Sequence, residues 1–278
     1  LKLYTITYQK AIVKYTYFYK INASRKSMFY HNLQKTVWSK IFCCRYSVDK
    51  PYSLFYNQVK TTKEYRYMTE KEKMLAGELF YSPHEQFKEE RLRAKELLYD
   101  YNHLRPDETD KKETLMKKLL GSIGQEFSIG QPFYCDYGYN IHIGSHFYAN
   151  TGCVMLDCGK ITIGNHVFLA PHVQLYTVNH PIHLEQRDAD YEYTKPITIK
   201  DHVWIGGNST VLPGVTIGEN SIIGAGSVVT KDIPDWSIAA GNPCKVIRSI
   251  TEDDKRLLFH NEEIDDEAWA DITSRMSF

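Results

Sequence analysis

Aliphatic residues return every six positions across much of the C-terminal half of the chain. An α-helix repeats near 3.6 residues and an ordinary strand near 2, so neither explains this spacing. A six-residue period with Gly-rich turns is typical of a parallel β-helix, in which three short strands form a triangular coil of about eighteen residues. The positions that carry the period are Ile163, Leu169, Leu175, Ile199, Ile205, Val211, Ile217, Ile223 and Val229.

The third position after most of these aliphatic residues holds Gly, Asn or His. These residue types tolerate positive φ better than most others, and a tight corner between strands requires that conformation. Four of the eleven histidines are therefore interpreted as corner residues rather than as metal ligands. The corner positions are His146, Gly152, His166, His172, His202, Asn208, Gly214, Asn220 and Gly226.

Signals for three helices precede the repeat. In MTEKEKMLAGELF, Thr69 and Glu72 form a capping box at the start of a helix. In the SPHEQF that follows, Ser82 and Glu85 predict a second capping box, with the proline between them at the first helical position. A third helix is expected over about 107–120, before a glycine that stops it.

These patterns divide the chain into a segment 1–67, a helical module 68–125, a β-helix 126–250 that forms the catalytic domain, and a tail 251–278 with a helix and a loose end. The first segment carries thirteen Lys and Arg against two Asp and Glu, and eleven of the twenty-one tyrosines. It has three readings: an organelle leader, a disordered or β-prone appendage, or translated upstream sequence. We favour the last, with Met68 as the true start, because a helix signal begins there.

The formal net charge is zero, but residues 68–278 carry twenty-one Lys and Arg against thirty-two Asp and Glu. An acidic catalytic body argues against nucleic acid as a partner. The six cysteines show no regular framework, which favours a reduced, cytoplasmic protein unless the first segment is an organelle leader. No apolar run approaches the length of a membrane span, so no membrane partner is expected.

The six-residue repeat is interrupted between Leu175 and Ile199, which lie twenty-four positions apart. Four repeats fit that interval, so the residues between are expected to leave the coil as a polar loop and return in phase. Long ordered loops on rigid scaffolds often carry function. His180 lies at the root of this loop, off the corner positions, and Pro181 helps to fix the chain there. An imidazole can take a proton at neutral pH, so His180 is a candidate base, with a surface turn histidine as the alternative.

Several motifs together resemble the maltose and galactoside O-acetyltransferases, which are hexapeptide-repeat acyltransferases. They are FYAN, LDCGKITIG, LAPHVQLYTVNHP, KPITIKDHVWIGG, VLPGVTIGENSIIGAGSVVTKDIP and AAGNPCKVIR. The resemblance extends upstream through MTEKEKMLAGELF, ERLRAKELL and NHLRP, and covers about residues 68–250. It implies a mainly β fold, a left-handed parallel β-helix with an N-terminal helical module, and a homotrimer with active sites between subunits.

The resemblance also implies direct transfer of an acetyl group from acetyl-CoA to a sugar hydroxyl of the maltose, glucose or galactoside type, with no metal required. His180 would act as general base, and the backbone N–H of Gly207 would stabilise the oxyanion. Acceptor contacts map to Tyr148, Asn150, Asp157 and Glu192. Coenzyme A contacts map to Trp204, Gly207, Ala225, Thr230, Lys231, Lys245 and Arg248.

Two departures from the family pattern bear on the acceptor. Family members often carry an aspartate after the first helix, where this chain has Tyr81 and Ser82. Galactoside enzymes have a second acid where this chain has Cys158. The identity of the sugar is therefore left open.

Three alternative functions are weighed against this one. An enzyme of the same fold could act on serine, an antibiotic hydroxyl or an amino sugar, but the helical module argues against these. A γ-type carbonic anhydrase needs three zinc-binding histidines, two of them with four residues between, and no close pair here has that spacing. A non-catalytic scaffold would not need His180 together with Trp204, Thr230 and Lys231. Release of CoA with a hydroxyl acceptor discriminates among them.

Overall fold

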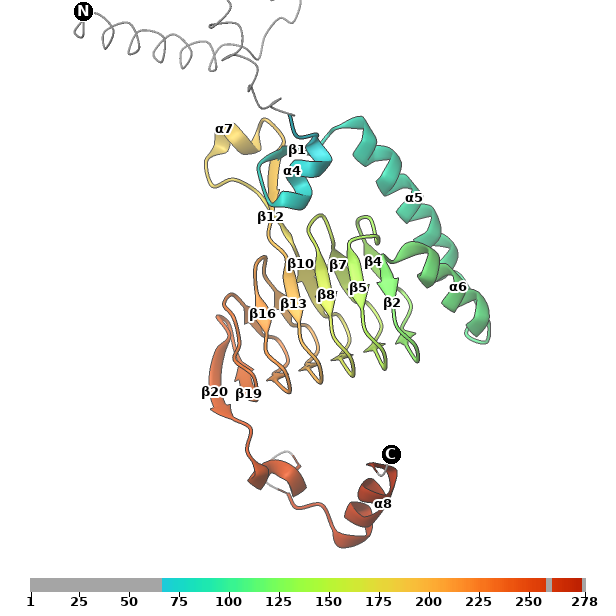
Figure 1. Cartoon of the computed structure of the whole chain (residues 1–278), viewed down its shortest axis with the longest axis vertical. Coiled ribbons are helices and arrows are strands. Elements are labelled where there is room, and N and C mark those ends of the chain that lie inside the picture. Colours follow the sequence, from blue (N-terminus) through green and yellow to red (C-terminus); the bar gives the residue numbers. More distant parts are fainter. Residues whose placement is uncertain (1–66, 259–261, 277–278) are drawn as a thin grey trace, which may run out of the picture. The chain divides into compact units, whose positions relative to one another are not determined.

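The computed structural model describes residues 67–258 and 262–276. The interpretations of the basic segment concern residues 1–66, which lie outside the described part of the chain. The described residues form a parallel β-helix with a helical module at its N-terminal end (Figure 1). The expected mainly β architecture of hexapeptide coils is thus confirmed.

Three sheets make up the coil, because consecutive strands turn a corner and each pairs with the strand one coil away. The first sheet contains β2 (Ser122–Ile123), β5 (Ile141–Ile143), β8 (Ile161–Ile163), β13 (Ile197–Ile199) and β16 (Thr216–Ile217). The second contains β3 (Ser128–Ile129), β6 (Tyr148–Ala149), β9 (Phe168–Leu169), β14 (Trp204–Ile205), β17 (Ile222–Ile223), β19 (Ser237–Ala240) and the antiparallel β20 (Lys245–Ser249). The third contains β4 (Tyr134–Cys135), β7 (Val154–Leu156), β10 (Gln174–Tyr176), β15 (Thr210–Val211) and β18 (Val228–Val229).

The periodic aliphatic residues point into the coil and stack on one another. Ile199, for example, pairs with Ile163 on one side and with Ile217 on the other, and all three are almost fully buried. Each such side chain contributes roughly 1.5–3 kcal/mol through removal from water. Since a coil buries its aliphatic face only against its neighbours, the stability of the β-helix depends on stacking.

The corner prediction is confirmed by the backbone. His146, His166, His172 and His202 have φ values of 55°, 54°, 59° and 59°, in the left-handed region. The other predicted corner residues also have positive φ: Gly152, Asn208, Gly214, Asn220 and Gly226. Within residues 67–258 and 262–276, no group of three or more His, Cys, Asp and Glu side chains is placed to hold a metal ion.

The helical module contains α4 (Glu70–Ala76), β1 (Phe80–Tyr81), α5 (Glu85–Asn102) and α6 (Thr109–Leu119). The capping box of Thr69 and Glu72 is confirmed. The second predicted capping box is wrong, because α5 begins after His84, which makes no side-chain cap. Ser82 and Pro83 form a turn instead, in which the N–H of Ser82 donates to the carbonyl of Asp190 in the inserted loop.

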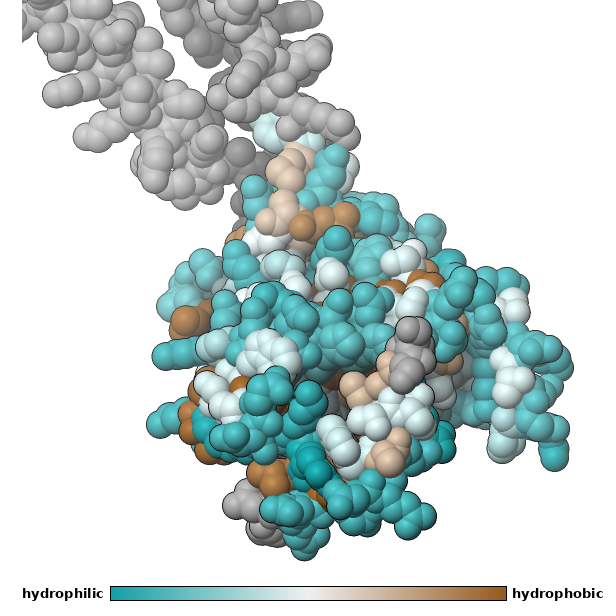
Figure 2. Space-filling view, turned by 60° about the horizontal axis from the view of Figure 1, so that its bottom comes forward, coloured by the Kyte–Doolittle hydropathy of each residue, from teal (hydrophilic) through white to brown (hydrophobic). Residues whose placement is uncertain are grey.

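The remaining elements lie in the inserted loop and the tail. The loop contains β11 (Val178–Asn179), α7 (Leu184–Arg187) and β12 (Tyr191–Thr194), and the tail contains the 3₁₀-helix η1 (Glu252–Arg256) and α8 (Asp266–Met276). None of the helices in the described residues is both long and apolar enough to cross a membrane. The face shown in Figure 2 is mostly hydrophilic, with small separate hydrophobic areas.

Candidate active site

The interruption of the repeat is a loop that leaves the third sheet after β10 and rejoins the first sheet at β13. Leu175 still pairs with Val211, and Ile199 still pairs with Ile217, so the coil continues in register beneath the loop. The expected departure and in-phase return of the chain are confirmed. The loop is ordered by its own short elements, because β11 and β12 pair in antiparallel fashion.

His180 follows β11 directly, and its side chain is exposed to solvent. Its backbone is held, since the N–H donates to Oδ1 of Asn179 at 2.9 Å. The next residue, Pro181, is buried, and its carbonyl accepts a hydrogen bond of 3.1 Å from the guanidinium of Arg187. The loop therefore presents an accessible imidazole on a fixed piece of chain, as a general base requires.

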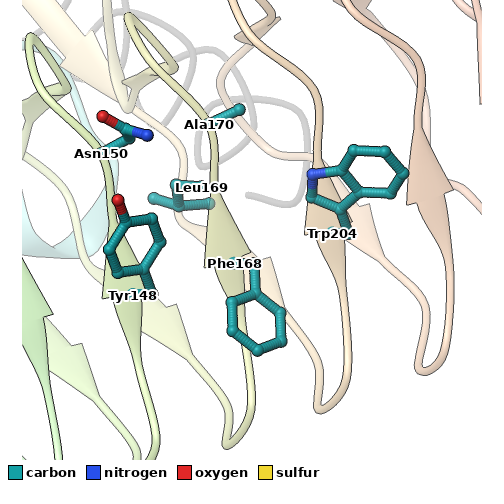
Figure 3. Close-up of a pocket in the computed structure, with 6 residues that line it drawn as sticks. All are labelled: Tyr148, Asn150, Phe168, Leu169, Ala170 and Trp204. Carbon is teal, nitrogen blue, oxygen red and sulfur yellow. The ribbon is translucent and has the colours of Figure 1, made fainter. Parts of the chain in front are cut away.

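A hollow of about 480 Å³ lies on the second sheet. The register places Tyr148 beside Phe168 and Phe168 beside Trp204, on three successive coils (Figure 3). Their side chains are 40%, 49% and 51% exposed, so they form a ladder of aromatic rings open to solvent. Asn150 and Ala170 line the same hollow. Three residues predicted to bind ligand, Tyr148, Asn150 and Trp204, are thus brought together.

Asp157 lies inside the protein and is fully buried. One carboxylate oxygen accepts the N–H groups of Asp136 and Tyr137 at 3.0 and 2.8 Å, and the other accepts that of Asn140 at 3.3 Å. Burial raises the pKa of Asp157 to about 7, against the opposing effect of these backbone donors. In this chain the carboxylate therefore organises the turn between β4 and β5, and its contact with an acceptor stays a prediction.

Asp136 is a candidate that the sequence reasoning missed. Its half-buried carboxylate accepts a long hydrogen bond of 3.5 Å from the thiol of Cys158, and burial raises its pKa. The positive charge of Arg91 lowers that pKa, and the negative charge of Glu192 on β12 raises it. An alignment of successive coils in the sequence would have identified it. Cys135 pairs with Met155, and Met155 pairs with Leu175, so Asp136 occupies the position in its coil that corresponds to the start of the inserted loop.

Gly207 lies at a close approach between coils. A Cβ at this position would meet the carbonyl oxygen of Pro171 at 3.1 Å. The neighbouring N–H groups donate to carbonyls one coil away, that of Gly206 to Ile223 and that of Asn208 to Pro171. Within the described residues no acceptor is found for the N–H of Gly207, so this donor is available to a ligand.

The other residues predicted to bind coenzyme A lie on the outer surface of the last coils. Ala225, Thr230, Lys231 and Lys245 are exposed. Arg248 differs, because its guanidinium already makes two hydrogen bonds with the carboxylate of Asp254, at 2.7 and 2.8 Å. That ion pair lowers the pKa of Asp254 to about 2. A phosphate at Arg248 would therefore have to compete with a carboxylate already in place.

Five of the predicted residues form two separate groups in one chain. Tyr148, Asn150 and Trp204 belong to the second sheet and its corner, whereas His180 and Glu192 belong to the loop between the third and first sheets. The coil, the helical module and the histidine loop define a hexapeptide-repeat acyltransferase.

Comparison with known proteins specifies the family. Residues 73–124 match the maltose acetyltransferase hexapeptide capping motif, and residues 196–231 match six bacterial transferase hexapeptides. The galactoside O-acetyltransferase of Escherichia coli K12 is 46% identical over 194 residues, which cover 70% of this chain and 96% of that protein. The chain belongs to the family of maltose and galactoside O-acetyltransferases, and it is therefore an O-acetyltransferase with acetyl-CoA as co-substrate.

Solved structures agree with this assignment. A maltose O-acetyltransferase from Clostridium difficile 630 is 50% identical with a TM-score of 0.66, and covers 67% of this chain and 100% of its own. A galactoside acetyltransferase in complex with coenzyme A is 44% identical with a TM-score of 0.69, and covers 72% of this chain and 100% of its own.

Proposed function

We propose that this enzyme transfers the acetyl group of acetyl-CoA to a hydroxyl of a sugar of the maltose, glucose or galactoside type, with His180 as general base. The observation that carries the proposal is the exposed imidazole of His180 on a loop whose backbone is tied down on both sides. A hydroxyl is a poor nucleophile until a base accepts its proton, and an accessible neutral imidazole supplies that base.

In the proposed reaction the sugar oxygen attacks the thioester carbonyl as its proton passes to His180. The tetrahedral intermediate carries a negative oxygen, which the N–H of Gly207 stabilises. Collapse of the intermediate breaks the carbon–sulfur bond and releases coenzyme A as the thiol once it takes up the proton from His180. The absence of an acceptor for the Gly207 N–H within the described residues supports its role as donor.

We further propose that the active site forms between subunits of a homotrimer. The aromatic ladder of Tyr148, Phe168 and Trp204 exposes three large rings on the outside of the coil. A second copy packed against it would cover these rings and could bring its own His180 loop to the hollow. This assembly would join the two groups of predicted residues that a single chain keeps apart.

A cytoplasmic location is also part of the proposal. The four cysteines in the described residues, Cys135, Cys153, Cys158 and Cys244, are buried and unpaired. Free thiols persist in reducing compartments, which supports a location inside the cell. Fractionation of cells that express the full chain would test it.

The test is release of free coenzyme A thiol from acetyl-CoA, with maltose, glucose, a galactoside and serine as acceptors. We expect sugar-dependent release, and His180→Ala should lower kcat by about 10²–10⁴-fold, since that is the usual contribution of a general base. The control is His202→Asn, which removes another exposed histidine but keeps a residue that tolerates the φ of 59°. Retention of more than a tenth of kcat by His180→Ala would refute the base, and faster acetylation of serine would refute the acceptor class.

A further inference from the structure

The helical module is joined to the catalytic loop by a small sheet of its own. β1, β12 and β11 form three antiparallel strands, with β12 in the middle. Phe80 pairs with Glu192 and Tyr81 with Tyr191, while Asn179 pairs with Tyr193. His180 follows Asn179 at the end of β11, and only β12 separates β11 from β1, the strand of the helical module.

The module holds β1 firmly. Phe80 is fully buried, and its ring meets that of Phe87 edge to face at 5.7 Å between centroids. Both belong to a cluster with Met74, Tyr137 and Cys158, which ties the module to the coil. At the other residue of β1, the N–H of Tyr81 donates to the carboxylate of Glu70 at 2.6 Å. The strand that borders the loop is therefore anchored by both packing and a hydrogen bond.

Thr194, the last residue of β12, lies where the module, the loop and the coil meet. It is 2% exposed, and its hydroxyl donates to the carbonyl of Met74 in α4 at 2.6 Å. On its other side, a Cβ added to Gly159 of the coil would come within 3.0 Å of the Thr194 Cβ. The turn that ends α4 also approaches closely, because a Cβ at Gly77 would meet the Thr194 carbonyl oxygen at 2.9 Å.

We infer that Thr194 is a positioning residue for the acetyl transfer, through which the helical module fixes the loop that carries His180. The inference rests on the proposed role of His180 as base. The hydroxyl of Thr194 joins β12 to the end of α4, and the sheet pairing passes that constraint to β11 and to the imidazole. The module thus completes the active site from a distance, without a contact of Thr194 with the reacting atoms.

The test compares Thr194→Val, which keeps the shape but removes the hydroxyl, with Thr194→Ser, which keeps the hydroxyl. Since small misplacements of a catalytic group are costly, Thr194→Val should lower kcat by about 10- to 100-fold. The KM for acetyl-CoA should stay within about twofold, because the coenzyme A residues lie on other coils, and Thr194→Ser should restore kcat to within about threefold of wild type. Thr198→Val, in β13 of the coil, is the matched control and should keep wild-type kcat.

A double substitution separates positioning from a general loss of structure. In a His180→Ala background, Thr194→Val should leave the residual rate unchanged, because its effect acts through the missing imidazole. An equal fold-loss in both backgrounds would overturn the inference. If Thr194→Val does not fold, Glu70→Ala loosens β1 at the module surface instead, and it should lower kcat in the same His180-dependent manner.

The outcomes also distinguish this inference from the proposed function. Wild-type kcat in His180→Ala would refute the general base, whatever Thr194 does. An inactive His180→Ala together with wild-type kcat in folded Thr194→Val would leave the base in place and refute the positioning role. A failure of Thr194→Ser to restore kcat would show that the hydroxyl is not the group that matters.

Discussion

The coil and the inserted loop are held in place by different kinds of contact. Each coil strand pairs with the strand of the neighbouring coil, and Ile199, for example, stacks between Ile163 and Ile217. The loop depends on distant chain, since the hydroxyl of Thr194 reaches a carbonyl 120 residues earlier in α4. The β-helix is therefore specified by a short repeat in the sequence, whereas the candidate site depends on contacts between residues far apart in the chain.

The largest expected loss of stability comes from a polar substitution at one of the buried six-residue repeat positions. Ile217 is fully buried between Ile199 and the coil that follows. Ile217→Asp would bury an unpaired carboxylate at a cost of several kcal/mol, a large part of the roughly 5–15 kcal/mol that stabilises a typical domain. We expect an insoluble or unfolded protein by circular dichroism.

The control for this change is Ile217→Val, which removes one methylene group and should cost about 0.5–1.5 kcal/mol. A soluble Ile217→Asp protein that melts cooperatively near the wild-type temperature would contradict the role of stacking in the coil.

The period explains how much of the molecule could be predicted from sequence. Val211 and His202 could be assigned to the interior and to a corner, because hydrophobic spacing and tolerance of positive φ are local properties. The start of α5 was predicted wrongly. The N–H of Ser82, which a capping box would use, donates to Asp190 instead, and no local sequence pattern indicates this distant partner. The two-group arrangement of the site was hidden for the same reason, since it depends on which sheet each residue enters.

A second prediction concerns the joint between module and coil. Tyr101 of α5 is almost fully buried, and its hydroxyl donates to the carbonyl of Ile129 in β3 at 2.5 Å. Burial raises the pKa of this hydroxyl to about 12. Tyr101→Phe would leave the carbonyl without this donor, and we expect a loss of about 1–3 kcal/mol in the free energy of unfolding by denaturant titration.

Tyr99→Phe on the same helix is the matched control, because Tyr99 is 65% exposed and should tolerate the change. Equal stability of the two variants would show that the module does not depend on this joint, and would weaken the contrast between local and distant contacts.

A third prediction tests the corners. Asn208 has φ of 58°, where a β-branched side chain is strained. Asn208→Val should lower the free energy of unfolding by roughly 1–2 kcal/mol, whereas Asn208→Gly should be nearly neutral, because glycine adopts this conformation freely. Thermal melting measures both, and equal stability of the valine and glycine variants would contradict the need for positive φ at this corner.

The smallest expected effect lies in a stack of three corner histidines. The rings of His146, His166 and His202 lie 4.3 and 4.8 Å apart and almost parallel. Partial burial, His146 and His202 hold the pKa of His166 below its usual value, while Asp201 and Glu126 oppose them. A proton thus binds His166 more readily in the unfolded chain, so stability is fully present above the unfolded pKa and falls as the pH drops through it toward the folded value.

Between pH 7 and 5, wild type should therefore lose slightly more stability than His166→Asn, which keeps a residue suited to the φ of 54°. The difference should stay below about 1 kcal/mol, because the rings are partly open to solvent and the charges are screened. Denaturant titrations at the two pH values measure it. An identical pH dependence of stability in both proteins would mean that the stacked histidines do not repel one another when protonated. The three histidines would then affect stability only through the backbone conformation that they allow at the corners.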